Sequence, residues 1–195
     1  MERNKMKTVV FFGSPRKQGN TRKMVDACIE KVGGEILTVD CCGGRFSACT
    51  DCRWCRSHAG CSIPDGMDDV YSWVEEADAV IIASPVHMGT LSGPLLSVLS
   101  RLQTYWSSKF VRVTDKVVPR KKAGCLLLTA GSSDFDMERN CIYTASFAFR
   151  LMNASFLGCV LADNTDHVPA QDNEHAMASA RRMGGSLSLW KGQEM

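Results

Sequence analysis

Short, continuous apolar runs alternate along the chain with stretches in which apolar residues recur every three or four positions. The first pattern is typical of strands buried on both faces of a sheet, and the second is typical of amphipathic helices. The apolar runs predict five strands, over residues 7–13, 35–40, 79–84, 123–130 and 155–162. The helical spacing predicts helices from Asn20 or Thr21 through Val32, and over residues 67–76, 94–106, 137–153 and 171–190.

Two of these helices carry local signals for where they begin. Asn20 or Thr21 suits the N-cap of the first, because short polar side chains accept hydrogen bonds from the first free N–H groups. Pro94 suits the first turn of the third, because a backbone N–H there has no partner within the helix. The apolar stripe of this helix continues into Tyr105 and Trp106, which is more aromatic surface than one sheet face needs. We therefore predict a homodimer or homotetramer.

Five short apolar strands separated by helices predict an α/β fold with a doubly wound, five-stranded parallel sheet. Connections between parallel strands are right-handed crossovers, so helices should cover both faces. The chain has no internal repeat and no low-complexity linker, so residues 1–195 are predicted to form a single domain with a cysteine-rich loop at 41–66. Ligands of such sheets bind beyond the carboxyl ends of the strands, so the loops that follow the strands carry the candidate chemistry.

Composition narrows the class of protein. With 45% hydrophobic residues and 23% charged residues the chain is globular, and a net charge of +2 favours neither nucleic acid nor a membrane surface as partner. The charged start and the lack of any apolar run near about 18 residues predict neither a signal peptide nor a membrane span. We therefore expect a cytoplasmic protein, whose ten cysteines are kept reduced. The basic segment 109–122 is predicted to be a solvated loop, with docking of an acidic partner or a cofactor phosphate as the alternative.

The loop G-S-P-R-K-Q-G-N-T-R, residues 13–22, joins the first strand directly to the first helix. Free N–H groups and the positive end of the helix dipole meet there, which favours an anion, and Arg16 can make a forked contact with a phosphate. The loop matches neither the G-x-x-x-x-G-K-S/T pattern of nucleoside triphosphatases nor the G-x-G-x-x-G pattern of dinucleotide sites. It is predicted to bind a phosphate, the alternative being an ordinary strand-to-helix turn.

Two more loops should line the same site, because they follow the third and fourth strands. S-P-V-H-M-G-T-L-S-G-P (84–94) is shaped by glycines and a proline, and T-A-G-S-S-D (129–134) supplies backbone N–H groups and small hydroxyls. Both suit contact with a flat heteroaromatic ring. His87 is either a catalytic or ring-edge residue or part of the loop wall, and we assign it no proton transfer.

These pieces together resemble the flavodoxin-fold, NADPH-dependent FMN reductase-like proteins over about residues 7–165. The resemblance rests on G-S-P-R-K-Q-G-N-T, on A-D-A-V-I-I-A-S-P-V-H-M-G with the helix behind it, and on the cysteine loop. It implies the flavodoxin-like strand order 2-1-3-4-5, FMN as cofactor and NAD(P)H as co-substrate. It also implies two sets of site residues: Ser14, Arg16, Gly19, Asn20 and Thr21 at the phosphate, and Ser84, Pro85, Val86, His87, Met88, Gly89, Ala130 and Gly131 at the isoalloxazine ring. The chain departs from the family pattern at His87, often an aromatic residue, and at Ser100, often an aspartate before Arg101.

Six of the ten cysteines fall between Cys41 and Cys61. Four of these, Cys49, Cys52, Cys55 and Cys61, have the spacing C-x2-C-x2-C-x5-C. Overlapping C-x2-C pairs let one loop bring three thiolates together, as in cubane iron–sulfur ligation, whereas structural zinc sites more often take two separate pairs. The spacing also resembles the motif of iron–sulfur flavoproteins, which implies a 4Fe-4S cluster near the FMN and assembly as a dimer or tetramer. Zinc, and thiols that bind no metal, are the alternatives. The cysteines on presumed core faces, Cys28, Cys125, Cys141 and Cys159, are predicted to act as small hydrophobes.

The resulting hypothesis is an FMN-binding oxidoreductase that passes electrons from NAD(P)H or a ferredoxin-like donor through FMN, with the cluster as a one-electron outlet. The first alternative is a cluster-free NAD(P)H-dependent reductase of FMN, quinones or nitro-compounds. Alternatives of other classes are a non-enzymatic electron carrier like flavodoxin and a metal-stabilised binding module. The expected partners are small electron donors or acceptors or a ferredoxin-like protein, with no nucleic acid and no membrane.

Overall fold

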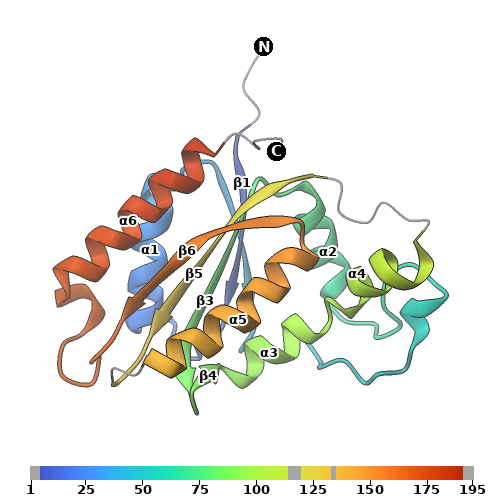
Figure 1. The fold of residues 1–195 in the computed structure, drawn as a ribbon, viewed down its shortest axis with the longest axis horizontal. Coiled ribbons are helices and arrows are strands. Elements are labelled where there is room, and N and C mark those ends of the chain that lie inside the picture. Colours follow the sequence, from blue (N-terminus) through green and yellow to red (C-terminus); the bar gives the residue numbers. More distant parts are fainter. Residues whose placement is uncertain (1–4, 114–119, 133–134, 191–195) are drawn as a thin grey trace.

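The computed structural model describes residues 5–113, 120–132 and 135–190. Its centre is a parallel sheet in the order β2-β1-β3-β5-β6, with the short β4 paired antiparallel to β3 (Figure 1). The strands are β1 (Lys7–Phe12), β2 (Glu35–Asp40), β3 (Ala79–His87), β4 (Thr90–Leu91), β5 (Lys122–Thr129) and β6 (Ala154–Ala162). The predicted α/β class is confirmed. The order differs slightly from the predicted 2-1-3-4-5, because an additional strand, β4, pairs with β3 outside the main order and shifts the numbering of the last two strands. At two residues, β4 is too short to leave an apolar pattern in the sequence.

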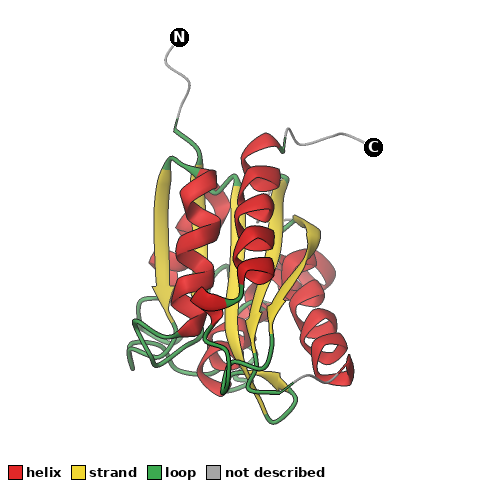
Figure 2. Cartoon of the chain, turned by 90° about the vertical axis from the view of Figure 1, so that its left-hand side faces the viewer, coloured by secondary structure: helices red, strands yellow, loops and turns green. Residues whose placement is uncertain are grey.

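Helices cover both faces of the sheet, as Figure 2 shows. They are α1 (Asn20–Val32), α2 (Met67–Glu76), α3 (Gly93–Ser100), α4 (Gln103–Ser107), α5 (Phe135–Leu151) and α6 (Glu174–Leu189). The core on one face draws residues from α1 and α6, and the core on the other face draws them from α2, α3 and α5. Among the described residues, no helix is both long and apolar enough to cross a membrane.

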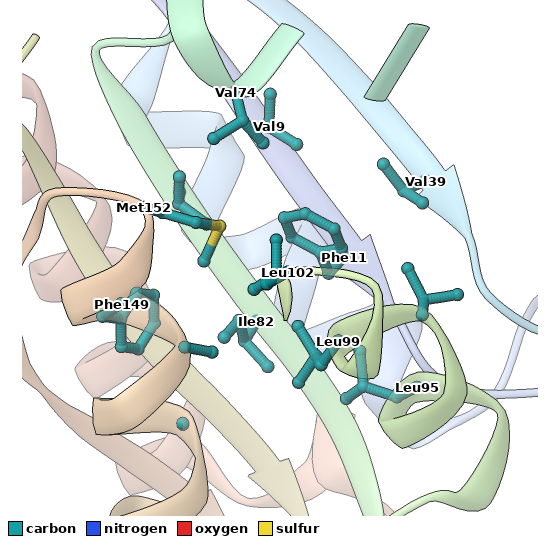
Figure 3. Close-up of a cluster of buried hydrophobic side chains, with 14 of the residues drawn as sticks. Val9, Phe11, Val39, Val74, Ile82, Leu95, Leu99, Leu102, Phe149 and Met152 are labelled. Carbon is teal, nitrogen blue, oxygen red and sulfur yellow. The ribbon is translucent and has the colours of Figure 1, made fainter. Parts of the chain in front are cut away.

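Consecutive residues of the central strands point to opposite cores, which is why their sequences are continuously apolar. Phe11 and Ile82 face the core of α2, α3 and α5, whereas Val10 and Ile81 face the core of α1 and α6. Figure 3 shows Phe11 and Ile82 packed with Leu95, Leu99 and Leu102 from the segment after β4. The predicted core cysteines also lie here: Cys28, Cys125 and Cys141 are fully buried and Cys159 is partly buried.

Two local predictions were wrong. The N-cap of α1 is Gly19, not Asn20 or Thr21. The helix predicted over 94–106 ends at Ser100, and α4 follows after a turn at Arg101 and Leu102. Tyr105 is buried within its own chain, where its ring meets Tyr71 edge-on at 5.5 Å between centroids. Tyr105 is therefore used inside the chain and gives no support to an oligomer, which stays a prediction.

The described parts of the basic segment 109–122 are only partly the solvated loop that the charge pattern predicts, since Lys109, Arg120 and Lys121 are exposed. Residues 108–112 form a π-helical turn after α4, and Lys122 is buried at the start of β5. The arginine at 112 binds backbone carbonyls of the cysteine loop. Residues 114–119 of this segment, like 133–134 of the loop after β5, lie outside the described residues. Among the described residues of this segment, Arg112 and Lys122 thus bind backbone carbonyls within the fold.

Candidate functional site

A cavity of about 400 Å³ opens beyond the carboxyl ends of β1, β3 and β5. Its walls come from the ends of β3 and β5, from the start of α1 and from the loops after β1, β5 and β6. These loops gather at the end of the sheet toward which the strand arrows point (Figure 2). The lining residues are Ser14, Pro15, Arg16, Gly19, Asn20, Thr21, Pro85, Val86, His87, Thr129, Gly131, Thr165 and Asp166. The structure therefore brings nine of the thirteen predicted FMN-site residues to one cavity.

The loop after β1 is anchored firmly at its first residue. The Gly13 N–H donates to the Ala83 carbonyl at 2.8 Å, and the Ser92 hydroxyl donates to the Gly13 carbonyl at 2.6 Å. A Cβ at Gly13 would lie 2.8 Å from the Cβ of Leu95, so only glycine lets α3 pack this close. Three residues on, the Arg16 N–H donates to the Ser14 hydroxyl at 3.2 Å and turns the loop toward α1.

The N-terminus of α1 meets the cavity with its first N–H groups uncapped by any side chain of the described residues. Uncapped N–H groups and the helix dipole favour an anion there. Asn20 does not cap the helix: its Oδ1 accepts a hydrogen bond from the Ala170 N–H at 3.0 Å. The side-chain amide nitrogen is then the group that Asn20 can offer a ligand. Thr21 is buried, and its hydroxyl lies 2.8 Å from the Thr129 hydroxyl.

Four predicted site residues do not line the cavity. The Ser84 hydroxyl donates to the Pro85 carbonyl at 2.7 Å and accepts from the Ser92 N–H at 2.9 Å, so it holds the loop from behind. Met88 and Gly89, at φ +50° and +71°, form the tight turn between β3 and β4, and the Met88 side chain is fully exposed. Ala130 is buried, and its N–H donates to the Ala162 carbonyl at 3.0 Å.

Four lining residues were missed: Pro15, Thr129, Thr165 and Asp166. Thr165 is fixed by its N–H, which donates to the Ala130 carbonyl at 2.9 Å. Asp166 reaches Gly131, where a Cβ would come within 2.4 Å of the carboxylate Oδ2. The rule that ligands bind beyond every carboxyl strand end, applied to the fifth predicted strand, would have found this loop.

The donor set fits a phosphorylated heteroaromatic cofactor. The cavity volume falls in the range of small-molecule sites, and Arg16 with the helix N-terminus supplies positive potential at one end. Gly19 completes the cradle, because a Cβ there would lie 2.9 Å from the Cβ of Arg16. Pro85, Val86 and the exposed His87 present a mostly apolar wall suited to a ring.

The cysteine loop lies beside α4 (Figure 1). Together with the segment from Arg101 to Ser107 it forms a second, much smaller cavity. Cys49, Cys52, Cys55 and Cys61 all line this cavity of about 20 Å³. The individual thiols have different neighbours. Cys52 Sγ lies 3.2 Å from the Ser62 hydroxyl, which lowers the pKa of that thiol, and Cys55 Sγ lies 3.3 Å from the Ser107 hydroxyl. The sequence motif therefore converges on one place in the fold.

The thiols are not drawn together around a metal position. Among the described residues, no group of three or more His, Cys, Asp or Glu side chains is arranged to hold a metal ion. As a donor set, four cysteines at one cavity fit an iron–sulfur cluster. The thiols would have to move closer together to ligate one, so the cluster stays a prediction.

A buried ion pair holds the cysteine loop against α3. Arg101 is 1% exposed, and its Nη1 donates to Asp65 Oδ2 at 2.7 Å and to the Ser47 carbonyl at 2.9 Å. Burial alone would raise the pKa of Asp65, but hydrogen bonds from Arg101 and backbone N–H groups hold that pKa below its usual value. The Ser100 hydroxyl accepts from the Cys49 N–H at 3.0 Å. Ser100, which departs from the family pattern, and Arg101, which matches it, therefore both position the cysteine loop.

Comparison with known proteins agrees with this geometry. The profile of the NADPH-dependent FMN reductase family matches residues 6–163. An iron–sulfur flavoprotein of Methanosarcina thermophila is 31% identical over 137 residues, which cover 69% of this chain and 68% of that protein. Another, of Archaeoglobus fulgidus, is 37% identical over 103 residues, 51% of this chain; this match spans only 47% of the relative's length.

Among solved structures, the NAD(P)H:quinone oxidoreductase from Methanothermobacter marburgensis aligns with a TM-score of 0.73 at 18% identity. The alignment covers 96% of this chain and 99% of that one, and at this identity it shows the fold alone. Together, the family profile and the curated relatives show that the chain belongs to the NADPH-dependent FMN reductase family, with iron–sulfur flavoproteins among its relatives.

Proposed function

We propose that the protein is an FMN-dependent oxidoreductase and that the 400 Å³ cavity is its FMN site. The observation that carries the proposal is the convergence of three predicted loops on one cavity at the N-terminus of α1. The FMN phosphate would lie against this helix end, within reach of Arg16, Ser14 and the side-chain amide of Asn20. Family membership supports FMN as the group that fits.

The residues at the end of β3 would orient the ring. Pro85 and Val86 offer a flat apolar wall, while the Ser84–Ser92 hydrogen bond behind them keeps this wall from shifting. FMN, when bound, accepts two electrons from a reduced nicotinamide and can release them one at a time. NAD(P)H and a ferredoxin-like protein are both kept as candidate donors, and no residue is assigned proton transfer.

We further propose that Cys49, Cys52, Cys55 and Cys61 ligate a 4Fe-4S cluster, the one-electron outlet for the flavin. Support comes from their spacing, from their shared cavity and from relatives whose names include iron–sulfur flavoprotein. The second candidate is a cluster-free NAD(P)H-dependent reductase of quinones or similar acceptors. It is favoured by the separation of the thiols in the structure and by the structural likeness to a quinone oxidoreductase.

Anaerobic purification separates these functions. A yellow protein whose flavin absorption is bleached by NADH or NADPH is expected for the oxidoreductase, whereas a flavin that neither nucleotide bleaches indicates an electron carrier. A colourless protein that takes up no FMN would refute the flavin site and leave a binding module.

The cluster is tested by reconstitution with iron and sulfide. About four irons per chain and loss of this iron in Cys55→Ala are expected. Cys42→Ala is the matched control, because Cys42 lies near the loop but does not line the cysteine cavity. Equal iron in wild type and Cys55→Ala would exclude the motif as ligand, and no iron in the wild type would leave the cluster-free reductase.

A further inference from the structure

The buried Arg101 has one donor that the fold does not use. Its Nη1 and Nη2 donate to Asp65, at 2.7 Å and 3.2 Å, and Nη1 also donates to the Ser47 carbonyl. Its Nε is buried and has no hydrogen-bond partner among the described residues. A buried N–H without an acceptor is costly, so each such group in a native protein calls for an explanation.

The position of this arginine indicates the acceptor. Arg101 lines the same small cavity as Cys49, Cys52, Cys55 and Cys61. Thiols are weak hydrogen-bond acceptors, so the Arg101 Nε–H can lie in the same cavity wall as the cysteines without a hydrogen bond to them. Sulfur atoms of an iron–sulfur cluster carry negative charge and accept hydrogen bonds, and such bonds help to set the reduction potential.

We propose that the Nε–H of Arg101 donates a hydrogen bond to a sulfur of the cluster held by the four cysteines. This rests on the cluster-binding part of the proposed function. Asp65 neutralises the guanidinium charge and fixes its plane through two hydrogen bonds, so Nε would keep its place in the wall of the cysteine cavity while the loop closes on iron. Because negative charge grows when the cluster gains an electron, the bond favours the reduced state and raises the reduction potential.

A purely structural role for Arg101 makes a different prediction. If the arginine only clasps the loop through Asp65, then Arg101→Lys and Asp65→Asn should have the same effect on the cluster. If Nε is a cluster donor, Arg101→Lys should lower the reduction potential, whereas Asp65→Asn keeps the donor and should not lower it. Arg112→Lys is the control for a nearby cation, since Arg112 binds the His58 carbonyl of the same loop at 2.9 Å.

The direct test is pulsed EPR on reconstituted, reduced protein made with ¹⁵N-labelled arginine. A nitrogen coupling on the cluster signal is expected in the wild type, in Asp65→Asn and in Arg112→Lys, and its loss is expected in Arg101→Lys. Iron should also pass to a chelator about 10–100-fold faster from Arg101→Lys, as for other outer-sphere partners of metal sites.

The outcomes separate this inference from the proposal on which it rests. A wild-type protein that binds iron but shows no arginine coupling overturns the Arg101 inference alone, and this holds even if Arg101→Lys does not fold. Arg101→Lys with an unchanged coupling and potential overturns it as well. A wild-type protein that takes up no iron overturns both.

Discussion

Lys122 is a lysine without exposed surface, at the first position of β5. Its Nζ donates to the Arg120 carbonyl at 2.7 Å and to the Met152 carbonyl at 3.2 Å. Burial, with a smaller contribution from the Arg120 charge, lowers the pKa of Lys122 from 10.5 to about 8. The folded chain therefore binds the proton of this lysine less tightly than the unfolded chain does.

The sign and size of the effect follow from this difference. Below pH 8 the lysine is charged in both states, and the folded state bears the full cost of burying the charge. Between about pH 8 and pH 10.5 the folded chain releases the proton first, so the free energy of unfolding rises with pH. Because each tenfold change in proton affinity is worth about 1.4 kcal/mol, the gain across this window is about 3 kcal/mol.

The assay is urea unfolding of the wild type and of Lys122→Met at pH 7 and pH 10.5. Methionine keeps the length of the side chain and carries no charge, so its stability should lack this rise. Between pH 7 and pH 10.5, the free energy of unfolding of the wild type should rise by about 3 kcal/mol more than that of Lys122→Met. The tyrosines and cysteines are the same in both proteins, so their contribution to the pH dependence cancels in the comparison. Lys31→Met replaces an exposed lysine, and its free energy of unfolding should change with pH as that of the wild type does. Parallel pH profiles for wild type and Lys122→Met would refute the reasoning.

Three further predictions concern the flavin site and assembly. Arg16→Ala should weaken FMN binding by about 1.5–3 kcal/mol, the range for a charge-assisted hydrogen bond; fluorescence titration with FMN and riboflavin checks this, and an unchanged FMN affinity removes Arg16 from the site. Gly13→Ala should lower the stability measured by thermal unfolding by about 1–3 kcal/mol, because the new methyl group would collide with Leu95. Gly93→Ala is the control and should not lower it, since a methyl group there meets no neighbour within 4 Å. Light scattering should give a dimer or tetramer of the 21.4 kDa chain, an expectation that now rests on the family resemblance alone because Tyr105 is buried, and a monomer mass would exclude assembly.

The sequence alone was sufficient for the class of fold and for the first loop of the site. Central parallel strands bury both faces, so their continuous apolar runs appear in the sequence without knowledge of their neighbours. The loop around Ser14, Arg16 and Gly19 was predictable for a similar reason, since a strand, a glycine-containing turn and a helix follow one another directly. The spacing of the four cysteines likewise placed them in one loop.

Tertiary structure alone decided the features that join distant segments. Asn20 caps no helix but accepts a hydrogen bond from Ala170, 150 residues away, and Thr165 reaches the cavity through its hydrogen bond to the Ala130 carbonyl. Tyr105 is covered by Tyr71 rather than by a second chain, and Arg101 is buried against Asp65. Such contacts depend on how helices, strands and loops pack rather than on local propensity. A polar or aromatic residue looks the same in the sequence whether its partner is solvent, another chain or a distant loop. Whether four thiols that share a loop come within reach of one metal is decided in the same way, by the packing of that loop on α3 and α4.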